Sequence, residues 1–193
     1  MLSKTVLRQA FRTNLSRDDH DTTLIATSTR ALNQRLIEFL TAQDGVWAAF
    51  EPLDFEPDVR EAFAATPHIR WAYPRIEPGN TLSFYEVSSR AQLAKNQFGI
   101  WEPEPATAKR VHMAELRGLL IPGLAFDLNC NRLGRGKGYY DRALGRELIK
   151  PKPLKIGIAL ERQVSTAPLP CDAHDIAMDL VVTEKRTLKG PVL

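Results

Sequence analysis

Residues 131–141 read Asn-Arg-Leu-Gly-Arg-Gly-Lys-Gly-Tyr-Tyr-Asp, between an apolar run and a segment with the spacing of a helix. Glycines at alternate positions give the backbone unusual freedom and allow a ligand to approach it closely. A chain bent in this way can direct successive N–H groups at one anion. The cations between the glycines add positive charge at the same place. The stretch therefore predicts a strand–loop–helix unit that binds phosphate.

The flanks of this loop support the same interpretation. Residues 119–126 are mostly apolar and predict a buried strand that leads into the loop, while residues 138–149 predict the helix that leaves it. The loop matches neither G-x-x-x-x-G-K-[ST] nor G-x-G-x-x-G. A bare G-x-G-x-G is more often a flexible turn than a ligand site. Here Arg132, Arg135 and Lys137, with the Tyr-Tyr-Asp that follows, favour phosphate binding.

The remaining chain alternates between helical and strand patterns without an internal repeat. This interleaving predicts one domain over residues 1–193 with an α/β fold, in which helices flank a largely parallel central sheet in three layers. We expect residues 96–110 to form a loop, and the strand that begins at 68 to stop at Pro74. The expected helices span 4–15, 18 or 21 to about 43, and 58–65, and the expected strands span 46–50, 68–73, 81–87, 155–160 and, as the last, 180–183.

The composition indicates an ordinary soluble globular protein. Of the 193 residues, 44% are hydrophobic and 25% are charged, and the net charge is +3. That mild excess of positive charge suits a small anionic ligand and is too small to predict nucleic-acid binding. No stretch has the pattern of a secretory signal or a membrane span. Cys130 and Cys171 form no CxxC or Cys/His cluster, so we expect free thiols in a reducing cytoplasm and no zinc site. We also expect the protein to be a monomer.

Two further sets of residues fit a phosphate site. Lys4 and Arg8 are four residues apart on one face of the first expected helix, behind Ser3 as its cap. Such a pair is usually a solvated basic face, yet cations at a helix start oppose its dipole, and a phosphate ligand would give a reason to keep them there. Asp141 is either a favourable charge in a first helical turn or a ligand for Mg²⁺. A second carboxylate for the metal would come from Asp172, Asp175 or Asp179.

Several of these stretches resemble the signature of one family in both content and order. Residues 122–127 followed by 131–141 resemble the signature of 5-formyltetrahydrofolate cyclo-ligases, also called methenyltetrahydrofolate synthetases. The other matching motifs are Lys4-x-x-x-Arg8, Tyr73-Pro74-Arg75-Ile76, Gly99-Ile100-Trp101-Glu102-Pro103, and His174-Asp175 with Asp179 and Thr183. The long glycine motif is highly specific, whereas each of the other motifs is weak by itself.

The resemblance implies an activity and a fold. Such enzymes convert 5-formyltetrahydrofolate, ATP and Mg²⁺ to 5,10-methenyltetrahydrofolate, ADP and phosphate. The γ-phosphoryl group is transferred to the formyl oxygen, and N10 of the folate then attacks the activated carbon. This chemistry requires positioning and charge neutralisation more than a nucleophilic side chain. The implied fold is a three-layer α/β fold like that of sugar-phosphate isomerases and CoA transferases.

The resemblance also assigns roles to individual residues. Arg135 and Lys137 would act in phosphoryl transfer, while Asp141 and Asp175 would bind Mg²⁺. The residues expected to contact ATP are Lys4, Arg8, Arg132, Leu133, Gly134, Arg135, Gly136, Lys137, Gly138, Tyr139 and Tyr140. Those expected to contact the folate are Glu51, Glu56, Phe98, Trp101 and Tyr139, with Phe98 and Trp101 as alternative stacking partners for the pterin. His174 is a weak candidate for a general base.

Two other functions are compatible with parts of the sequence. A folate- or nucleotide-binding regulator could keep the fold and lack turnover, although the joint presence of the cations and carboxylates argues against it. A sugar-phosphate isomerase or transferase would need a catalytic acid or base in the pocket and no ATP. Turnover that depends on ATP separates the enzyme from both alternatives.

Overall fold

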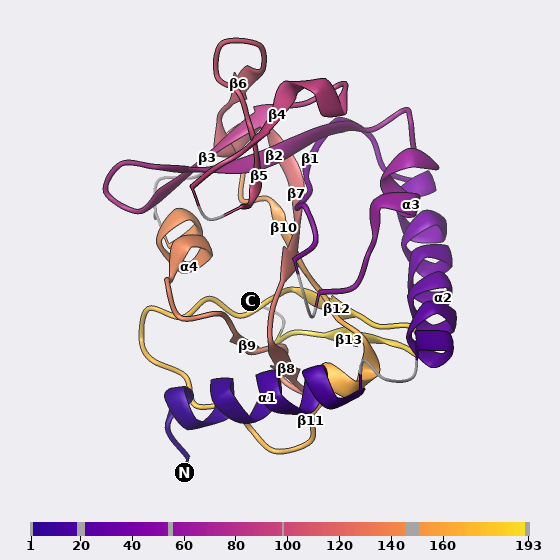
Figure 1. Ribbon diagram of the computed structural model, residues 1–193, viewed down its shortest axis with the longest axis vertical. Helices are drawn as coiled ribbons and strands as arrows, with labels where there is room; N and C mark the ends of the chain where they lie inside the picture. Colours follow the sequence, from indigo (N-terminus) through magenta and orange to yellow (C-terminus); the bar gives the residue numbers. More distant parts are fainter. Residues whose placement is uncertain (1, 19–21, 54–55, 98, 146–150, 192–193) are drawn as a thin grey trace.

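A computed structural model describes residues 2–18, 22–53, 56–97, 99–145 and 151–191 (Figure 1). An eight-stranded sheet runs through the molecule in the order β13-β12-β10-β7-β1-β2-β3-β6. These strands are β1 (Val46–Ala48), β2 (Arg70–Glu77), β3 (Thr81–Glu86), β6 (Lys109–Val111), β7 (Leu116–Pro122), β10 (Leu154–Ile158), β12 (Leu180–Val182) and β13 (Thr187–Lys189).

The middle of the sheet is parallel and its edges are antiparallel. The pairs β12–β10, β10–β7, β7–β1 and β1–β2 all run in parallel. On one edge β2–β3 and β3–β6 are antiparallel, and on the other β12–β13 is antiparallel. The predicted α/β fold with a largely parallel central sheet is therefore confirmed.

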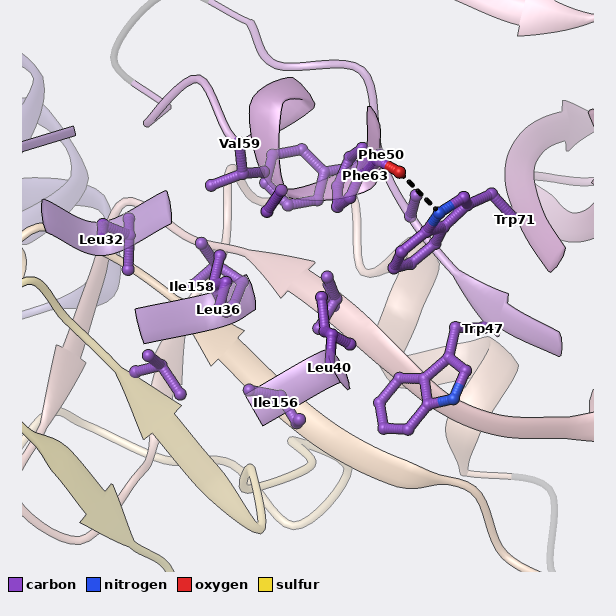
Figure 2. Close-up of a cluster of buried hydrophobic side chains, with 14 of the residues drawn as sticks. Leu32, Leu36, Leu40, Trp47, Phe50, Val59, Phe63, Trp71, Ile156 and Ile158 are labelled. Carbon is purple, nitrogen blue, oxygen red and sulfur yellow. Dashed lines mark hydrogen bonds between the residues drawn. The ribbon is translucent and has the colours of Figure 1, made fainter. Parts of the chain in front are cut away.

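Two helices cover one face of this sheet, α2 (Thr22–Thr41) and α3 (Arg60–Ala64). Leu32, Leu36 and Leu40 recur on one side of α2 and are fully buried against Ile156 and Ile158 of β10 (Figure 2). Burying a leucine side chain stabilises a fold by about 1.5–3 kcal/mol, so this stripe fixes the helix on the sheet. The indole N–H of Trp71 donates to the carbonyl of Phe63 at 3.2 Å and ties α3 to β2. None of the helices described is long and apolar enough to cross a membrane.

The opposite face is covered by a small second sheet and a short helix. The second sheet has the order β11-β8-β9 and consists of β11 (Val164–Ser165), β8 (Ala125–Asp127) and β9 (Arg132–Leu133), and the helix is α4 (Tyr139–Leu144). Helix α1 (Lys4–Asp18) packs on this second sheet, where Leu7 and Phe11 contact Leu133 and Leu169. Figure 1 shows α1 beside β8 and β11, so it forms the outermost element on this side. The other short elements are β4 (Leu93–Lys95), β5 (Trp101–Pro103) and the 3-10 turns Arg90–Gln92, Met113–Glu115 and Glu161–Gln163.

The strand predicted over 119–126 is wrong as a single element, because the chain turns between β7 and β8. Pro122 ends β7, and Gly123 follows in a place where a Cβ atom would lie 2.8 Å from the ring of Phe126. The chain turns there, and Leu124 donates its N–H to the carbonyl of Leu133. An apolar run has the same appearance whether it is one buried strand or two, so the pattern alone does not reveal this turn.

Four other boundaries also differ from the prediction. Strand β2 continues through Pro74, because beyond Ala72 it pairs with β3 alone and a missing N–H costs little at such a position. The region 96–110 was predicted as loop, yet it contains β5 and the start of β6. Strand β13 follows β12 and was not predicted. Helix α4 ends at Leu144 before Gly145, and residues 146–149 of the predicted helix lie outside the described residues.

A buried carboxylate holds the turn that precedes the glycine loop. Asp127 is 1% exposed, and its Oδ1 accepts from the N–H groups of Asn129 and Asn131, both at 2.9 Å. Its Oδ2 accepts from the side-chain Nδ2 of Asn131 at 2.9 Å and from the backbone N–H of Leu169 at 3.0 Å. Cys130 lies within this turn at a φ of 60°, in the left-handed region. Both cysteines are free, as predicted.

Replacing this carboxylate should destabilise the fold. In Asp127→Asn, one accepting oxygen becomes an NH₂ group that faces buried N–H donors. Because each buried polar group left unsatisfied costs about 1–3 kcal/mol, we expect the free energy of unfolding to fall by about 2–5 kcal/mol in urea titrations. The control is Asp44→Asn, whose carboxylate is 84% exposed, and it should change stability by less than about 0.5 kcal/mol. Equal stability of the two variants would contradict this role of Asp127.

Candidate functional site

A cavity of about 1000 Å³ lies at the carboxyl ends of parallel strands. Its lining includes Phe50 just after β1, Pro74 of β2 beyond its pairing with β1, and Pro122 at the end of β7. In open α/β sheets this edge is the usual place for a ligand. The glycine loop 134–138, the β2–β3 hairpin and β5 form further walls.

The structure brings the residues predicted for the site together in this cavity. Every one of them that the structure describes contributes to its lining: Lys4, Arg8, Glu51, Glu56, Trp101, Arg132, Leu133, Gly134, Arg135, Gly136, Lys137, Gly138, Tyr139, Tyr140, Asp141 and Asp175. Phe98 lies outside the described residues. The assembly draws on five separate parts of the chain, and the roles of the individual residues stay predictions.

The three glycines of the loop serve different physical purposes. Gly136 and Gly138 have φ values of 104° and 63°, which favour glycine. Gly134 has no such requirement, but a Cβ atom there would lie 2.7 Å from the Nη1 of Arg132. A Cβ atom on Gly136 would lie 3.4 Å from the guanidinium of Arg8. The loop therefore combines left-handed turns with close approach of two arginine side chains.

A partly buried ion pair links the two ends of the loop. The Nη2 of Arg132, in β9, lies 2.8 Å from the Oδ2 of Asp141, in α4, and these side chains are 7% and 15% exposed. The other oxygen of Asp141 accepts from the Ile176 N–H at 3.3 Å, so the same carboxylate also holds the segment after 175. The guanidinium of Arg132 lies 5.6 Å from the centre of the Tyr140 ring. The Nε of Arg132 is buried and has no partner among the residues described, which leaves one donor for a ligand.

Helix α1 brings its cations to the same wall of the cavity. The Nε of Arg8 donates to the carbonyl of Gly134 at 3.0 Å, and Arg12 donates to the carbonyl of Arg135 at 3.3 Å. These bonds fix the position of the glycine loop relative to the helix. Arg135, Gly136 and Lys137 are exposed at its tip. Lys137 forms no ion pair within the described part of the chain.

The ammonium group of Lys4 lies between two carboxylates. It donates to Asp172 at 2.6 Å and also to Asp175. Burial alone would lower the pKa of Lys4, but the hydrogen bonds and charges of the two carboxylates outweigh it and raise that pKa. For Asp175, burial is the largest single influence and acts to raise the pKa, but the hydrogen bonds from Lys4 and the Asp172 backbone, with the charge of Lys4, together outweigh it and lower the pKa. Both groups are therefore held in their charged forms.

One group of side chains could hold a divalent cation. Asp172, His174 and Asp175 each offer one ligand atom, and these atoms lie within 4.8 Å of one another. Asp141 lines the same cavity, but it is outside this group and is held by Arg132. Of the carboxylates left open by the sequence, Asp172 and Asp175 line the cavity. Asp179 does not line it, and its Oδ1 accepts from the ammonium of Lys155 at 2.7 Å.

Carboxylates and an aromatic ring form other parts of the cavity wall, beside the glycine loop and at β5. Glu56 accepts from the N–H of Leu53 at 3.0 Å and pairs with Arg135 at 3.1 Å. Trp101 is half-buried in β5, where Lys95 lies 5.3 Å from the centre of its ring. The carboxylate of Glu51 lies 4.0 Å from Arg90, whose guanidinium is 5.2 Å from the same ring. This end of the cavity can accept hydrogen bonds and stack against a flat group.

The two tyrosines after the loop face different surroundings. Tyr139 lies 5.6 Å from the guanidinium of Arg142, and that group donates to the carbonyl of Asn80 at 2.8 Å. Helix α4 is thereby tied to the turn of the β2–β3 hairpin. Tyr140 is enclosed, and burial, with a smaller contribution from Glu56, raises its pKa despite the opposing charge of Arg132.

Several lining residues were not predicted. Glu102 is 4% exposed in β5, and the hairpin residues 77–80 form one side of the cavity. A signal existed for both, since Glu102 belongs to the Gly-Ile-Trp-Glu-Pro motif and Pro78-Gly79-Asn80 is typical of a turn. The apolar lining residues Ile76 and Leu82 alternate like any core strand, so no sequence signal distinguishes them.

The arrangement separates two kinds of chemistry within one cavity. The end at the glycine loop gathers five basic side chains, those of Lys4, Arg8, Arg132, Arg135 and Lys137. Three of them, Lys4, Arg132 and Arg135, form ion pairs with carboxylates there. The other end presents carboxylates beside Trp101. Such a cavity fits a polyanion at one end and a flat group rich in N–H donors at the other.

Comparisons with known proteins agree with this geometry. The chain is 30% identical over 128 residues to a probable 5-formyltetrahydrofolate cyclo-ligase of Schizosaccharomyces pombe, covering 61% of this chain and 62% of that protein. It is 36% identical over 119 residues to the mouse (Mus musculus) 5-formyltetrahydrofolate cyclo-ligase, covering 58% of each. Each alignment thus spans less than two thirds of the curated relative's own length.

A solved structure matches over a greater length. The NMR structure of 5,10-methenyltetrahydrofolate synthetase from Aquifex aeolicus has a TM-score of 0.74 and 35% identity, with 100% of this chain and 96% of that chain covered. Residues 1–184 match the model of the 5-formyltetrahydrofolate cyclo-ligase family. That match includes all five parts of the chain that supply the predicted site residues. This chain therefore belongs to the 5-formyltetrahydrofolate cyclo-ligase family.

Proposed function

We propose that this chain catalyses the ATP- and Mg²⁺-dependent conversion of 5-formyltetrahydrofolate to 5,10-methenyltetrahydrofolate, with release of ADP and phosphate. One observation carries the proposal. The described residues that the sequence predicted for the site, from Lys4 to Asp175, all line one cavity. Basic side chains gather at one end of this cavity, and carboxylates lie beside Trp101 at the other end. The printed names of the relatives, cyclo-ligase and methenyltetrahydrofolate synthetase, agree with it.

The triphosphate of ATP fits the cationic end of the cavity. The unpartnered Nε of Arg132 is a buried donor that a phosphate oxygen would satisfy. The missing Cβ atoms of Gly134 and Gly136 leave the guanidinium groups of Arg132 and Arg8 close to the loop backbone. Arg135 and Lys137, exposed at the loop tip, can follow the charge of the γ-phosphoryl group as it moves.

The carboxylates beside this end fit Mg²⁺. Magnesium takes carboxylate ligands together with phosphate oxygens, and it would neutralise charge on the phosphates. Asp172 and Asp175 already hold one positive charge between them, the ammonium of Lys4. We assign the metal to Asp175 and Asp141. Asp172 and His174 each have a ligand atom within 4.8 Å of that of Asp175.

We infer the chemical steps from the family resemblance. A formyl oxygen is a poor leaving group, so the reaction first forms a bond between this oxygen and the γ-phosphorus while the bond to ADP breaks. N10 of the folate then attacks the formyl carbon and releases its proton to solvent, and the oxygen departs as part of the phosphate as its bond to the carbon breaks. The side chains of the cavity hold the reactants in line and balance the negative charge, which is the main demand of phosphoryl transfer.

The other features of the chain fit a small-molecule enzyme. The net charge of +3 fits neither a nucleic-acid surface nor a strongly basic membrane-binding surface. Two free thiols suit a reducing compartment. We propose a cytoplasmic monomer whose substrate is the folate, with or without additional glutamate residues.

The direct test is to mix the protein with 5-formyltetrahydrofolate, ATP and Mg²⁺ and to follow the absorbance of the methenyl product. We expect a rise that requires both ATP and Mg²⁺. Binding of folate or ATP, seen as a thermal shift, without any rise would favour the non-catalytic regulator and contradict the proposal. A ligand at 100 times its Kd adds about 2.7 kcal/mol of stability, which such a shift detects readily.

Lys137→Ala should weaken the use of ATP without affecting the fold. The ammonium is exposed, so its loss should leave the Tm unchanged. Loss of one charge-assisted contact should raise the KM for ATP roughly tenfold, while the KM for the folate stays the same. The matched control is Lys109→Ala, an exposed lysine on β6 that does not line the cavity. An unchanged KM for ATP would remove Lys137 from the site.

Asp141→Asn and Asp175→Asn should both raise the Mg²⁺ concentration needed for half-maximal rate and lower kcat. They should differ in stability, because Asp141 also neutralises the partly buried guanidinium of Arg132. We expect Asp141→Asn to lose about 1–3 kcal/mol in urea titrations, and Asp175→Asn to lose less. Wild-type Mg²⁺ dependence in either variant would contradict the assignment of that residue to the metal.

A further inference from the structure

Glu102 lines the cavity as a buried carboxylate with little to balance it. The residue is 4% exposed in β5, next to Trp101. Its Oε1 accepts from the N–H of Ile76 at 3.1 Å. Within the described ranges, its Oε2 accepts no hydrogen bond and the carboxylate forms no ion pair.

The other carboxylates of the described lining each have a side-chain donor. The pairs are Asp141 with Arg132, Asp172 and Asp175 with Lys4, Glu51 with Arg90, Glu56 with Arg135, and Glu77 with the hydroxyl of Tyr85. Glu102 is the exception in this set. The difference does not result from exposure, since Asp172 is 59% exposed and is paired, while Glu102 is buried.

The Oε2 of Glu102 opens onto the cavity, because neither oxygen of this carboxylate is a fully buried atom without a partner. A ligand that displaces water from this oxygen has to supply hydrogen bonds in its place, since a charged acceptor left unsatisfied in a complex weakens binding. An ionised carboxylate can accept about four hydrogen bonds, and here the protein supplies one. The remaining accepting capacity lies on the wall of a cavity, where a bound molecule with N–H groups could use it.

The surroundings of Glu102 define the kind of molecule. Trp101, Ile76 and Ile100 line the same region and offer an aromatic ring and apolar side chains. A flat heterocycle with adjacent N–H donors on one edge would stack or pack there and donate to the carboxylate. The pterin of the proposed substrate has such an edge, formed by its 2-amino group and the neighbouring ring N–H.

We propose that Glu102 accepts hydrogen bonds from the aminopyrimidine edge of the pterin and thereby determines substrate orientation and specificity. The proposal rests on the function proposed above and deepens it. Glu56, which the family resemblance assigned to the folate, is already bound by Arg135 and by the N–H of Leu53. Glu102 is therefore a separate acceptor, and it belongs to a motif in which the sequence resemblance assigned a role to Trp101 alone.

The test measures binding of 5-formyltetrahydrofolate to wild type and to Glu102→Gln without ATP, by calorimetry. In the variant one accepting oxygen becomes an NH₂ donor, whichever way the amide is turned. We expect Kd for the folate to rise roughly ten- to hundredfold, the range for loss of a hydrogen bond to a charged group, while Kd for ATP is unchanged. The control is Glu104→Gln, an exposed residue just after β5 that does not line the cavity, and it should bind like wild type.

A second ligand separates recognition from a structural role of the bond to Ile76. An analogue of 5-formyltetrahydrofolate that lacks the 2-amino group should bind to wild type more weakly than the parent folate does. To Glu102→Gln, the analogue should bind as tightly as the parent folate or more tightly. If the analogue loses the same factor in both proteins, or if Glu102→Gln binds the parent folate as wild type does, the proposal is overturned. Those results would leave the proposed activity intact, whereas a wild type that binds no folate would overturn both.

Discussion

The ion pair between Arg132 and Asp141 is the contact on which the site depends. It joins β9 to α4 across the glycine loop, and the second oxygen of Asp141 holds Ile176, so one carboxylate fixes three parts of the cavity wall. The geometry of the loop follows from it. A Cβ atom on Gly134 would lie 2.7 Å from the Nη1 of Arg132 and would push this guanidinium out of its present position, and the left-handed Gly136 and Gly138 bring the chain back to Asp141. Breaking this pair would leave a buried positive charge and loosen the loop at once.

The cavity contains two regions that suit different ligand groups. At the loop, Lys4, Arg132 and Arg135 pair with carboxylates, while Arg8 and Lys137 add positive charge that no ion pair within the described residues balances. At β5, the Glu102 carboxylate has one backbone donor and can accept further N–H groups. In the proposed reaction two substrates meet these conditions, ATP with its triphosphate and the folate with its donor-rich ring, and the γ-phosphoryl group would meet the formyl oxygen between them. The pairing of Lys4 with Asp172 and Asp175 places a cation on the acidic segment that lines this cavity.

Sequence reasoning predicted the class of the fold and most of the site, for identifiable reasons. The apolar period of Leu32, Leu36 and Leu40 directly encodes the buried face of a helix. The glycine loop and its cations line the cavity, as expected of a site, and phosphate binding by this loop stays a prediction. The turn at Gly123 could not be predicted, because it arises from the packing of Phe126. Strand β2 continues past Pro74 because only one neighbour remains there, a property of the sheet and not of the residue. Glu102 was missed since its lack of a partner is a fact of three-dimensional contacts.

In the proposed reaction, the formyl oxygen of the substrate becomes an oxygen of the released phosphate. To follow this oxygen, 5-formyltetrahydrofolate labelled with ¹⁸O in the formyl group is mixed with ATP, Mg²⁺ and the protein, and the phosphate is measured by mass spectrometry. We expect one ¹⁸O atom in each molecule of phosphate formed with the methenyl product. Unlabelled phosphate from a reaction that still forms this product would contradict the transfer of the γ-phosphoryl group to the formyl oxygen.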